Sequence, residues 1–453
     1  MMPSRSLLQA STAIALLLTS QHALAAGYAL REQSSTAQAN AFAGATSAAR
    51  DISYMFFNPA ALALQDGHQA HGSLSYILPQ GKFKDGAATT SPTLGAVPIA
   101  GGDNAGDVSE DALVPALYLS TEITEGLTLG LGVNAPFGLT TDNDDGWIGR
   151  YHALKSELTS ININPAVAFA AGDHFAFGAG VQVQYIDTEL GSAIDIGSIG
   201  AAAGVPGAVP TAQDGEVDLE ADDWGIGFNL GAMVMPSAKT RFGLAFRSEI
   251  DHRAEGSADF DNGDSGAVGD ILNANGLLID SGISAEVTTP ATISAGAYHE
   301  YDSGLALMAE IAWTDWSVFD ELRVQFDNPA QGDNVTTEAW DDSIFVALGA
   351  SYALTPALSL HGGIAYDQSP IPDDTRTPRL PGSDRYWTAI GASLDLGTGI
   401  SLNASYTHIF MEDADLELEA GADPAGENFF RGDLSGRYEN QIDIITVGGT
   451  IRF

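Results

Sequence analysis

The sequence AGYALREQSSTAQANAFAGATSAARDISYMFFNPAALALQDG, residues 26–67, differs in pattern from everything that follows it. It is apolar enough to require burial, yet it has neither the alternation of a strand nor the long stripe of an amphipathic helix. It ends near Asn58-Pro59-Ala60, where asparagine and proline together stop a segment and set a turn. From residue 68 onward, apolar residues alternate with small or polar ones, which is the period of a strand. The pattern predicts a plug at 26–67 inside a closed barrel built from 68–453.

Residues 1–25 have the features of a secretory signal peptide. Arg5 supplies the charged start, residues 7–18 are apolar, and Ala23-Leu24-Ala25 is an A-x-A cleavage site, so we expect the mature chain to begin at Ala26. The apolar run is too short to cross a bilayer, and no later stretch reaches about 18 consecutive apolar residues. We therefore expect an exported chain without a membrane helix, which leaves the periplasm, the outer membrane or the medium.

The composition narrows the possible partners. The chain has 453 residues, enough for two soluble domains or one large barrel, and it contains no cysteine. Its 18 Lys and Arg against 59 Asp and Glu give a net charge of −41, which argues against nucleic acid as a partner. Such an acidic composition is typical of proteins that remain soluble in a salty medium. The alternative is that divalent cations bridge acidic loops to anionic lipid headgroups.

Fourteen segments after residue 67 have strand periodicity, and fourteen is an even number, as expected for a bacterial outer-membrane barrel. They are 68–79, 112–122, 126–136, 157–171, 174–190, 222–236, 240–252, 285–300, 304–316, 340–353, 357–367, 385–396, 399–410 and 441–453. Short linkers such as 171–173 and 397–399 alternate with long ones such as 80–111 and 411–440. Short turns at one end and long loops at the other predict an all-β fold, a 14-stranded antiparallel transmembrane β-barrel.

The last strand carries the clearest two-faced pattern. Ile445, Val447, Gly449, Ile451 and Phe453 share one face, while threonines and Arg452 lie on the other. A closed barrel can expose the apolar face to lipid and still pair every backbone group. A C-terminal Phe on such a strand also resembles the signal read by the barrel-assembly machinery, which we expect as a partner.

Proline interrupts the third predicted strand at Asn134-Ala135-Pro136-Phe137-Gly138. Proline cannot donate to a ladder and is found at bulges or edges. In a barrel without edges, Pro136 with Gly138 predicts a kink that leaves a local gap in the wall. The alternative is that the strand ends at Asn134 and a loop begins.

Two long loops are unusually apolar. Residues 191–210 read GSAIDIGSIGAAAGVPGAVP, and 271–279 read ILNANGLLI, which predicts a short amphipathic helix. Exposed apolar surfaces often mark binding, so Ile271, Leu277 and Leu278 become candidates for a landing site for an apolar ligand. The alternative is a mobile loop, or a helix that caps the barrel mouth.

No catalytic or metal-binding constellation emerges. Gly263-Asp264-Ser265-Gly266 resembles a protease turn but lies in an acidic loop without a strand. The nine histidines show no metal-ligand spacing. We therefore expect neither an enzyme nor a metal or cofactor.

Several motifs, in order, resemble the FadL/TodX family of outer-membrane channels for hydrophobic compounds, and most of all its long-chain fatty acid transporters. The similarity covers essentially the whole mature chain. The matching stretches are Ala26-Gly27-Tyr28, Asn58-Pro59-Ala60, 223–229, Phe246-Arg247-Ser248-Glu249, 312–317, 363–372 and 384–387.

The resemblance implies a monomeric barrel closed by an N-terminal hatch. It implies capture of a long-chain fatty acid or other hydrophobic small molecule on loops, binding in an inner pocket, and sideways exit at the kinked third strand. Transport would be passive and without cofactor, in the outer membrane of a Gram-negative bacterium, where lipid and lipopolysaccharide surround the protein. A general porin or an outer-membrane hydrolase is disfavoured.

The resemblance also suggests ligand-binding residues. Ala26, Tyr28, Leu30 and Trp316 would reach the pocket, and Arg323 occupies the position of a family lysine that binds the fatty carboxylate. A second family arginine has no counterpart, because this chain has Asp187-Thr188-Glu189 there. Neutral alkanes or aromatic hydrocarbons therefore remain alternative substrates, and an ion pair with Asp320 or Glu321 remains an alternative role for Arg323.

Overall fold

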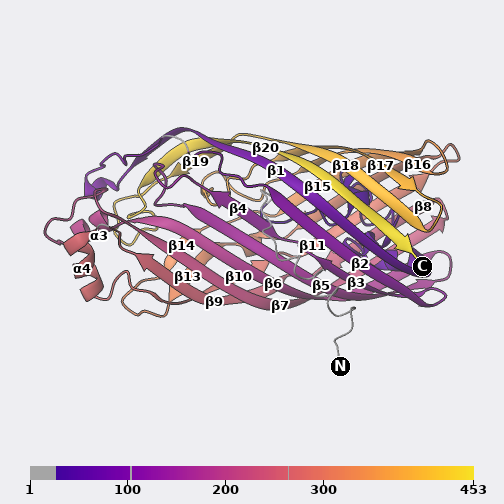
Figure 1. Ribbon diagram of the computed structural model, residues 1–453, viewed down its shortest axis with the longest axis horizontal. Helices are drawn as coiled ribbons and strands as arrows, with labels where there is room; N and C mark the ends of the chain where they lie inside the picture. The colour runs from indigo at the N-terminus through magenta and orange to yellow at the C-terminus, as the bar shows by residue number, and fades with distance from the viewer. Residues whose placement is uncertain (1–26, 103–104, 264) are drawn as a thin grey trace, which may run out of the picture.

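The computed structural model describes residues 27–102, 105–263 and 265–453; the predicted signal peptide and Ala26 lie outside these residues. Within the described ranges, twenty β-segments form a single sheet. The sheet closes because β1 (His68–Thr89) pairs antiparallel with both β2 (Ala112–Thr124) and β20 (Asp433–Arg452). The predicted closed barrel is confirmed, and Figure 1 shows its strands running obliquely around one long axis.

The described segments form the fourteen strands that cross the barrel, as predicted. Each of these fourteen, whether continuous or interrupted, is called a wall below. The unbroken walls are β1, β2, β5 (Lys155–Ala171), β6 (Phe175–Asp195), β7 (Asp214–Ser237), β16 (Leu358–Asp367), β17 (Arg385–Asp395) and β20. The interrupted walls are β3 (Leu127–Asn134) with β4 (Gly138–Asp142), β8 (Thr240–Arg247) with β9 (Ile250–Asp261), β10 (Ser281–Thr289) with β11 (Thr292–Glu300), β12 (Leu305–Thr314) with β13 (Glu321–Phe326), β14 (Asn334–Thr337) with β15 (Ser343–Ala353), and β18 (Ile400–Met411) with β19 (Ala414–Leu418).

Short helices account for the rest of the regular structure. Inside the barrel lie α2 (Ser35–Gln38), η2 (Ile52–Phe56) and η3 (Pro59–Leu64). Between strands lie η4 (Pro92–Leu94), α3 (Ile196–Ala202), α4 (Gly266–Ala274) and η5 (Trp316–Val318). Across the residues that the structure describes, no helix has the length and hydropathy of a membrane span.

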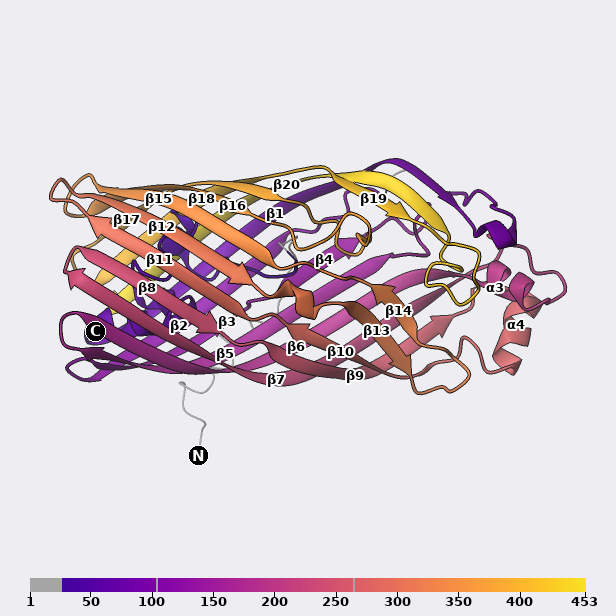
Figure 2. The ribbon, with the colours of Figure 1, turned by 180° about the vertical axis from the view of Figure 1, so that it is seen from behind.

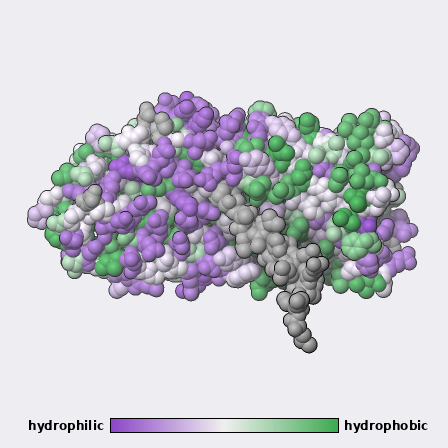
Figure 3. Space-filling view, in the orientation of Figure 1, coloured by the Kyte–Doolittle hydropathy of each residue, from purple (hydrophilic) through white to green (hydrophobic). Residues whose placement is uncertain are grey.

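The outer surface is apolar over one half of the barrel. On β20, Val447 is 52% exposed, while Thr446 on the opposite face is fully buried; Phe453, directly after β20, is 75% exposed. Large apolar side chains are similarly exposed on other strands around the barrel, for example Leu244 on β8, Ile364 on β16 and Ile390 on β17. Figure 3 shows the green apolar surface over the half that carries the short turns and the purple hydrophilic surface over the other half. This exterior belt is what a lipid-facing barrel requires.

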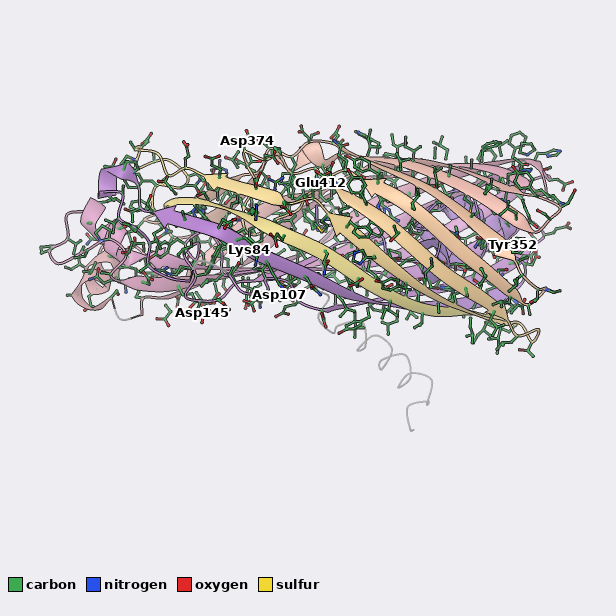
Figure 4. All side chains as sticks on the ribbon, turned by 90° about the horizontal axis from the view of Figure 1, so that it is seen from above. Lys84, Asp107, Asp145, Tyr352, Asp374 and Glu412 are labelled. Carbon is green, nitrogen blue, oxygen red and sulfur yellow. The ribbon has the colours of Figure 1, made fainter. Side chains whose placement is uncertain are left out.

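Several strands continue far beyond their predicted ends, into stretches expected to be loops. In β7 the residues before 222 still alternate, with Val217 and Leu219 buried and Glu216 and Glu220 facing out. Here the outer face is acidic because this half of the barrel stands above the apolar belt. Figure 4 places Lys84, Asp107 and Asp145 on this long-loop half and Tyr352 near the short turns.

Residues 27–67 lie inside the barrel, close to the end with the short turns (Figures 1 and 2). Their side chains are almost all buried. Glycines on the inner wall make room for them: a methyl group on Gly178 would lie 2.4 Å from the backbone of Pro59, and one on Gly363 would lie 2.0 Å from the Asn40 carbonyl oxygen. The segment therefore packs backbone to backbone against the wall.

Candidate ligand cavities and the wall gap

The wall is open between β2 and β4. The β2–β3 ladder stops at Leu117 opposite Val133. Among the described residues, β4 forms a ladder with β5, and on its other side Thr141 makes an isolated bridge to Ser109, before β2 begins. Asn134 ends β3, Pro136 lies in the break, and Gly138 begins β4. The predicted interruption is thus present, and the strand resumes after it instead of passing into a loop.

The N-terminal segment fills the break from inside. Leu30 N donates to Pro136 O at 2.8 Å, and Gly138 N donates to Tyr28 O at 2.9 Å, so Ala29 bridges Phe137 as a neighbouring strand would. Gln33 Nε2 donates to Ala135 O at 2.6 Å. The backbone groups that proline and the kink leave without a β2 partner are therefore satisfied by residues 28–33.

A large apolar cavity lies on the long-loop side of this contact. This outer cavity has an empty volume of ≈ 840 Å³. Leucine, isoleucine and valine side chains from β4, β5, β7, β10 and β13 form its walls, including Leu139, Leu158, Leu219, Ile283 and Val324. Tyr28, Phe319 and Trp340 form an aromatic floor, with ring centroids 4.8–5.8 Å apart.

Two ionisable groups border the outer cavity from the links between strands. Arg379 is held by Lys155 O at 3.0 Å and Ser156 Oγ at 3.1 Å, both acting as acceptors. Burial lowers its pKa to about 10, with the nearby charge of Arg431 acting in the same direction. Glu338 accepts from Trp340 Nε1 at 2.9 Å, and burial raises its pKa to about 8. At neutral pH these two links therefore bring a charged guanidinium and a largely protonated carboxyl to the cavity. Glu157 of β5 also lines it and pairs with Lys155 at 3.3 Å.

Arg323 lies elsewhere. Its neighbours Leu322 and Val324 face the outer cavity, so Arg323 on β13 points to the opposite, outer side of the wall. Its guanidinium pairs with Glu321 at 2.6 Å and with Asp333 at 3.1 Å. The predicted carboxylate partner is thus not brought to the cavity, and the ion pair with Glu321 that was the alternative is present. The alternation of side chains along a strand would have shown that Arg323 points outward, but residues 321–326 were not predicted to form a strand.

The remaining predicted ligand residues divide between two places. Tyr28, Leu30 and Trp316 are buried around the break, with Tyr28 and Trp316 rings 4.8 Å apart. The loop residues form a separate cluster: Leu272 and Leu278 of the α4 region pack with Ile196 and Val268, while Ile271 is 40% exposed. The expected helix at 271–279 covers only residues up to Ala274.

Asn58-Pro59-Ala60 fastens the buried segment to β6 and β7. Asn58 Nδ2 donates to Thr46 O at 2.8 Å and to Ala232 O at 3.3 Å, while its side-chain oxygen caps η3 through Ala60 N. The hydrogen bonds to the wall break itself come from Tyr28 to Gln33. The Asn-Pro-Ala turn therefore anchors the segment two and three walls away from the break, at β6 and β7.

Sequence reasoning missed Arg379 and Glu338. The sequence Thr377-Pro378-Arg379-Leu380-Pro381 does carry a signal, because an arginine enclosed by prolines and an apolar residue stands out in an otherwise acidic chain. Glu338 carries none, since it is one of many acids, and only the close approach of Trp340 and Arg379 distinguishes it.

A closed β-barrel with an apolar belt on its outer surface is the architecture of outer-membrane β-barrel proteins. The model of the family described as outer membrane protein transport protein (OMPP1/FadL/TodX) matches residues 16–453, and this chain belongs to that family. A putative outer membrane protein of Neisseria meningitidis is 30% identical over 95% of both chains. A long-chain fatty acid transport protein of Escherichia coli is 27% identical over 88% of this chain and 91% of its own.

The solved structure of a Pseudomonas aeruginosa FadL homologue superposes with a TM-score of 0.86, covering 94% of this chain and 100% of its own at 24% identity. That similarity supports the fold. Membership of the family makes this chain an outer-membrane transport protein for hydrophobic compounds, and it confirms the predictions of localisation and of a transporter in place of an enzyme.

Proposed function

We propose that the protein takes up long-chain fatty acids across the outer membrane by passive diffusion. The observation that carries the proposal is the outer cavity, an apolar chamber with one basic side chain, Arg379, at its border. The apolar walls would bind the acyl chain, at roughly 0.8 kcal/mol per buried CH₂, which favours long chains. Arg379 would bind the carboxylate, because a guanidinium offers paired donors to two oxygens.

The path follows from the arrangement of the cavities. The ligand first contacts the α3–α4 cluster at the long-loop end, which we place outside the cell, and then enters the outer cavity. Movement of residues 28–33 away from the break would open the way to the gap between β2 and β4 and so into the membrane. Residues 26–67 act as a hatch that keeps the barrel closed to water-soluble molecules.

The membrane environment follows from the same orientation. Lipid and lipopolysaccharide would contact the apolar belt and the acidic surface above it. Phe453, exposed at the end of β20, would be the residue read by the barrel-assembly machinery. We propose a monomer, because the barrel of a single chain closes on itself.

The test compares Arg379→Gln with Arg323→Gln in the purified full-length chain, using oleate and oleyl alcohol as ligands. Loss of the charge-assisted pair predicts at least about tenfold weaker oleate binding for Arg379→Gln and little change with oleyl alcohol. Arg323→Gln should behave as the unmodified protein. If Arg323→Gln weakened oleate binding and Arg379→Gln did not, Arg323 would be the residue that binds the carboxylate.

Neutral substrates are the second candidate, because the Arg379 guanidinium already has two protein acceptors. If both variants bind oleate and hexadecane like the parent protein, the head group is not recognised. Alkanes or aromatic hydrocarbons then become the better substrates. Free passage of small sugars through liposomes carrying the unmodified chain would instead indicate a porin.

A further inference from the structure

A second cavity lies behind the N-terminal segment, on the side opposite the outer cavity. This inner cavity has an empty volume of ≈ 770 Å³. Leu30 of the N-terminal segment and Pro136 and Phe137 of the wall break form part of its lining. Aromatic rings of the hatch and the wall, among them Phe57 and Phe345, make most of its lining apolar. An acyl chain that passed Tyr28 would enter this space before it reached the gap.

Arg247 projects into the inner cavity without a counter-ion. It ends β8 and lies on the inner face, two residues beyond the buried Ala245. Its guanidinium donates to Gln182 Oε1 and, at 2.7 Å, to Phe56 O, and it lies 4.2 Å from the centroid of the Phe56 ring. None of the carboxylates in the described ranges lies within 4.0 Å of it.

The acid that borders the same cavity is already engaged. Glu310 accepts from Thr46 N at 3.1 Å and from Thr46 Oγ1 at 2.8 Å, so it holds the hatch. Arg150 and Arg431 do have carboxylate partners, Asp214 and Glu427. Arg31 also lines the inner cavity, but its guanidinium lies over the Phe345 ring, 3.9 Å from the centroid. A charge inside a protein is costly unless it is paired, and two neutral acceptors compensate a guanidinium less well than a carboxylate does.

We propose that Arg247 binds the carboxylate of an anionic amphiphile in the inner cavity, as a second binding site between the outer cavity and the wall gap. This inference rests on the proposed uptake of fatty acids and specifies the class of substrate: a single acyl chain with an acidic head. The tail would lie along Phe57, Phe137 and Phe345, and the head group would replace Gln182 and the Phe56 carbonyl at the guanidinium.

The site has a consequence for the hatch. Phe56 O belongs to the turn just before Asn58, which anchors the hatch to β6 and β7. A carboxylate that takes the Arg247 donors would free this carbonyl and remove one of the contacts that hold residues 52–58 to the wall. Arrival of the ligand would thereby weaken the attachment of the hatch to the wall at a place apart from the break that residues 28–33 fill.

The experiment supplies an internal counter-ion. Gln182→Glu places a carboxylate on the atom that Arg247 already contacts, while Gln184→Glu adds the same charge two residues along the same buried face, where it contacts His252. Arg247→Gln removes the cation. The full-length variants would be titrated with oleate and with oleyl alcohol, their thermal unfolding measured, and a brominated fatty acid located in crystals by its anomalous signal.

We expect two oleate sites in the parent chain and in Gln184→Glu. Gln182→Glu and Arg247→Gln should lose one of the two, with affinity for it at least about tenfold weaker. Bromine density in the inner cavity should vanish in both, while binding in the outer cavity and the unfolding temperature remain. Equal binding curves for all variants, or density only in the outer cavity, would overturn the proposal. If, in that case, Arg379→Gln were the one variant that lost oleate binding, the proposed function would stand and the second site would not.

Discussion

Single methyl groups decide how closely the hatch lies against the wall. Gly362 and Gly363 are neighbours on β16 with opposite faces. A methyl group on Gly363 would lie 2.0 Å from Asn40 O, and one on Gly362 would lie 3.6 Å from its nearest neighbour. We expect Gly363→Ala to displace the hatch and make liposomes permeable to small sugars, with Gly362→Ala as the matched control. Equal, low permeability of the two variants would show that the hatch tolerates the shift.

We expect Glu338 to make ligand binding depend on pH. Its carboxyl, with a pKa of about 8, is neutral below that value and ionised above it. The ionised form would repel a bound carboxylate and compete for Arg379, so oleate affinity should fall between pH 7 and pH 9, by up to roughly tenfold. Glu338→Gln should flatten this dependence, and a parent protein with pH-independent affinity would contradict it.

The same group also affects folding, in a direction that can be checked. The pKa is raised from its ordinary value of 4.5, so the folded chain binds more protons than the unfolded chain between 4.5 and about 8. The contribution of Glu338 to stability is therefore present below that window and is lost as the pH rises through it.

Among the elements, the broken β3–β4 wall and the N-terminal segment act as a pair. Ala29 and Phe137 face each other without a direct hydrogen bond, flanked by the Leu30–Pro136 and Gly138–Tyr28 bonds. Such positions bring Cα atoms to about 4.5 Å, within the range of a disulfide. The chain has no cysteine of its own, so a designed pair reports on this contact alone.

We expect Ala29→Cys with Phe137→Cys to block uptake when oxidised, because the segment can no longer leave the break. Reduction should restore uptake. Each single cysteine variant serves as a control and should transport under both conditions. Full uptake by the oxidised double variant would show that ligand leaves by another route.

At the scale of the whole molecule, the barrel closes without the hatch. β1 pairs with β2 and β20 through ladders that involve no residue before His68. Deletion of residues 26–60 should therefore leave a folded barrel with an open interior. We expect liposomes with this variant to pass small sugars rapidly, and circular dichroism should show unchanged β-structure. A deletion variant that folds and stays closed to sugars would rule out the hatch role.

The sequence predicted best those features that depend on burial along the local chain. Alternation predicted fourteen walls, and the composition of 26–67 predicted a buried segment, because both patterns reflect burial along the local chain. The ends of the strands were wrong at the long-loop side. In β7 and β20 the outer residues change from apolar to charged above the lipid belt, so a search for exposed apolar residues stops too early.

The site residues were harder to predict from the sequence, because their surroundings depend on which strands become neighbours. Arg323 looked suitable from its position in the chain, but an extra strand, β13, turns it outward beside Glu321 and Asp333. Arg379 and Arg247 lie more than 130 residues apart. Nothing local distinguishes a guanidinium that meets a carboxylate from one that meets only Gln182 and a carbonyl.

The sequence by itself determined that this chain forms a closed, lipid-facing barrel, and it predicted a buried N-terminal segment and an interruption at Pro136, for which a loop was the alternative. Those features follow from periodicity, from the missing amide hydrogen of proline and from the inability of residues 26–67 to form a strand. Only the tertiary structure decided which residues fill the break, where the cavities lie and which charges border them. These depend on side chains from walls distant in the chain, which closure of the barrel brings together.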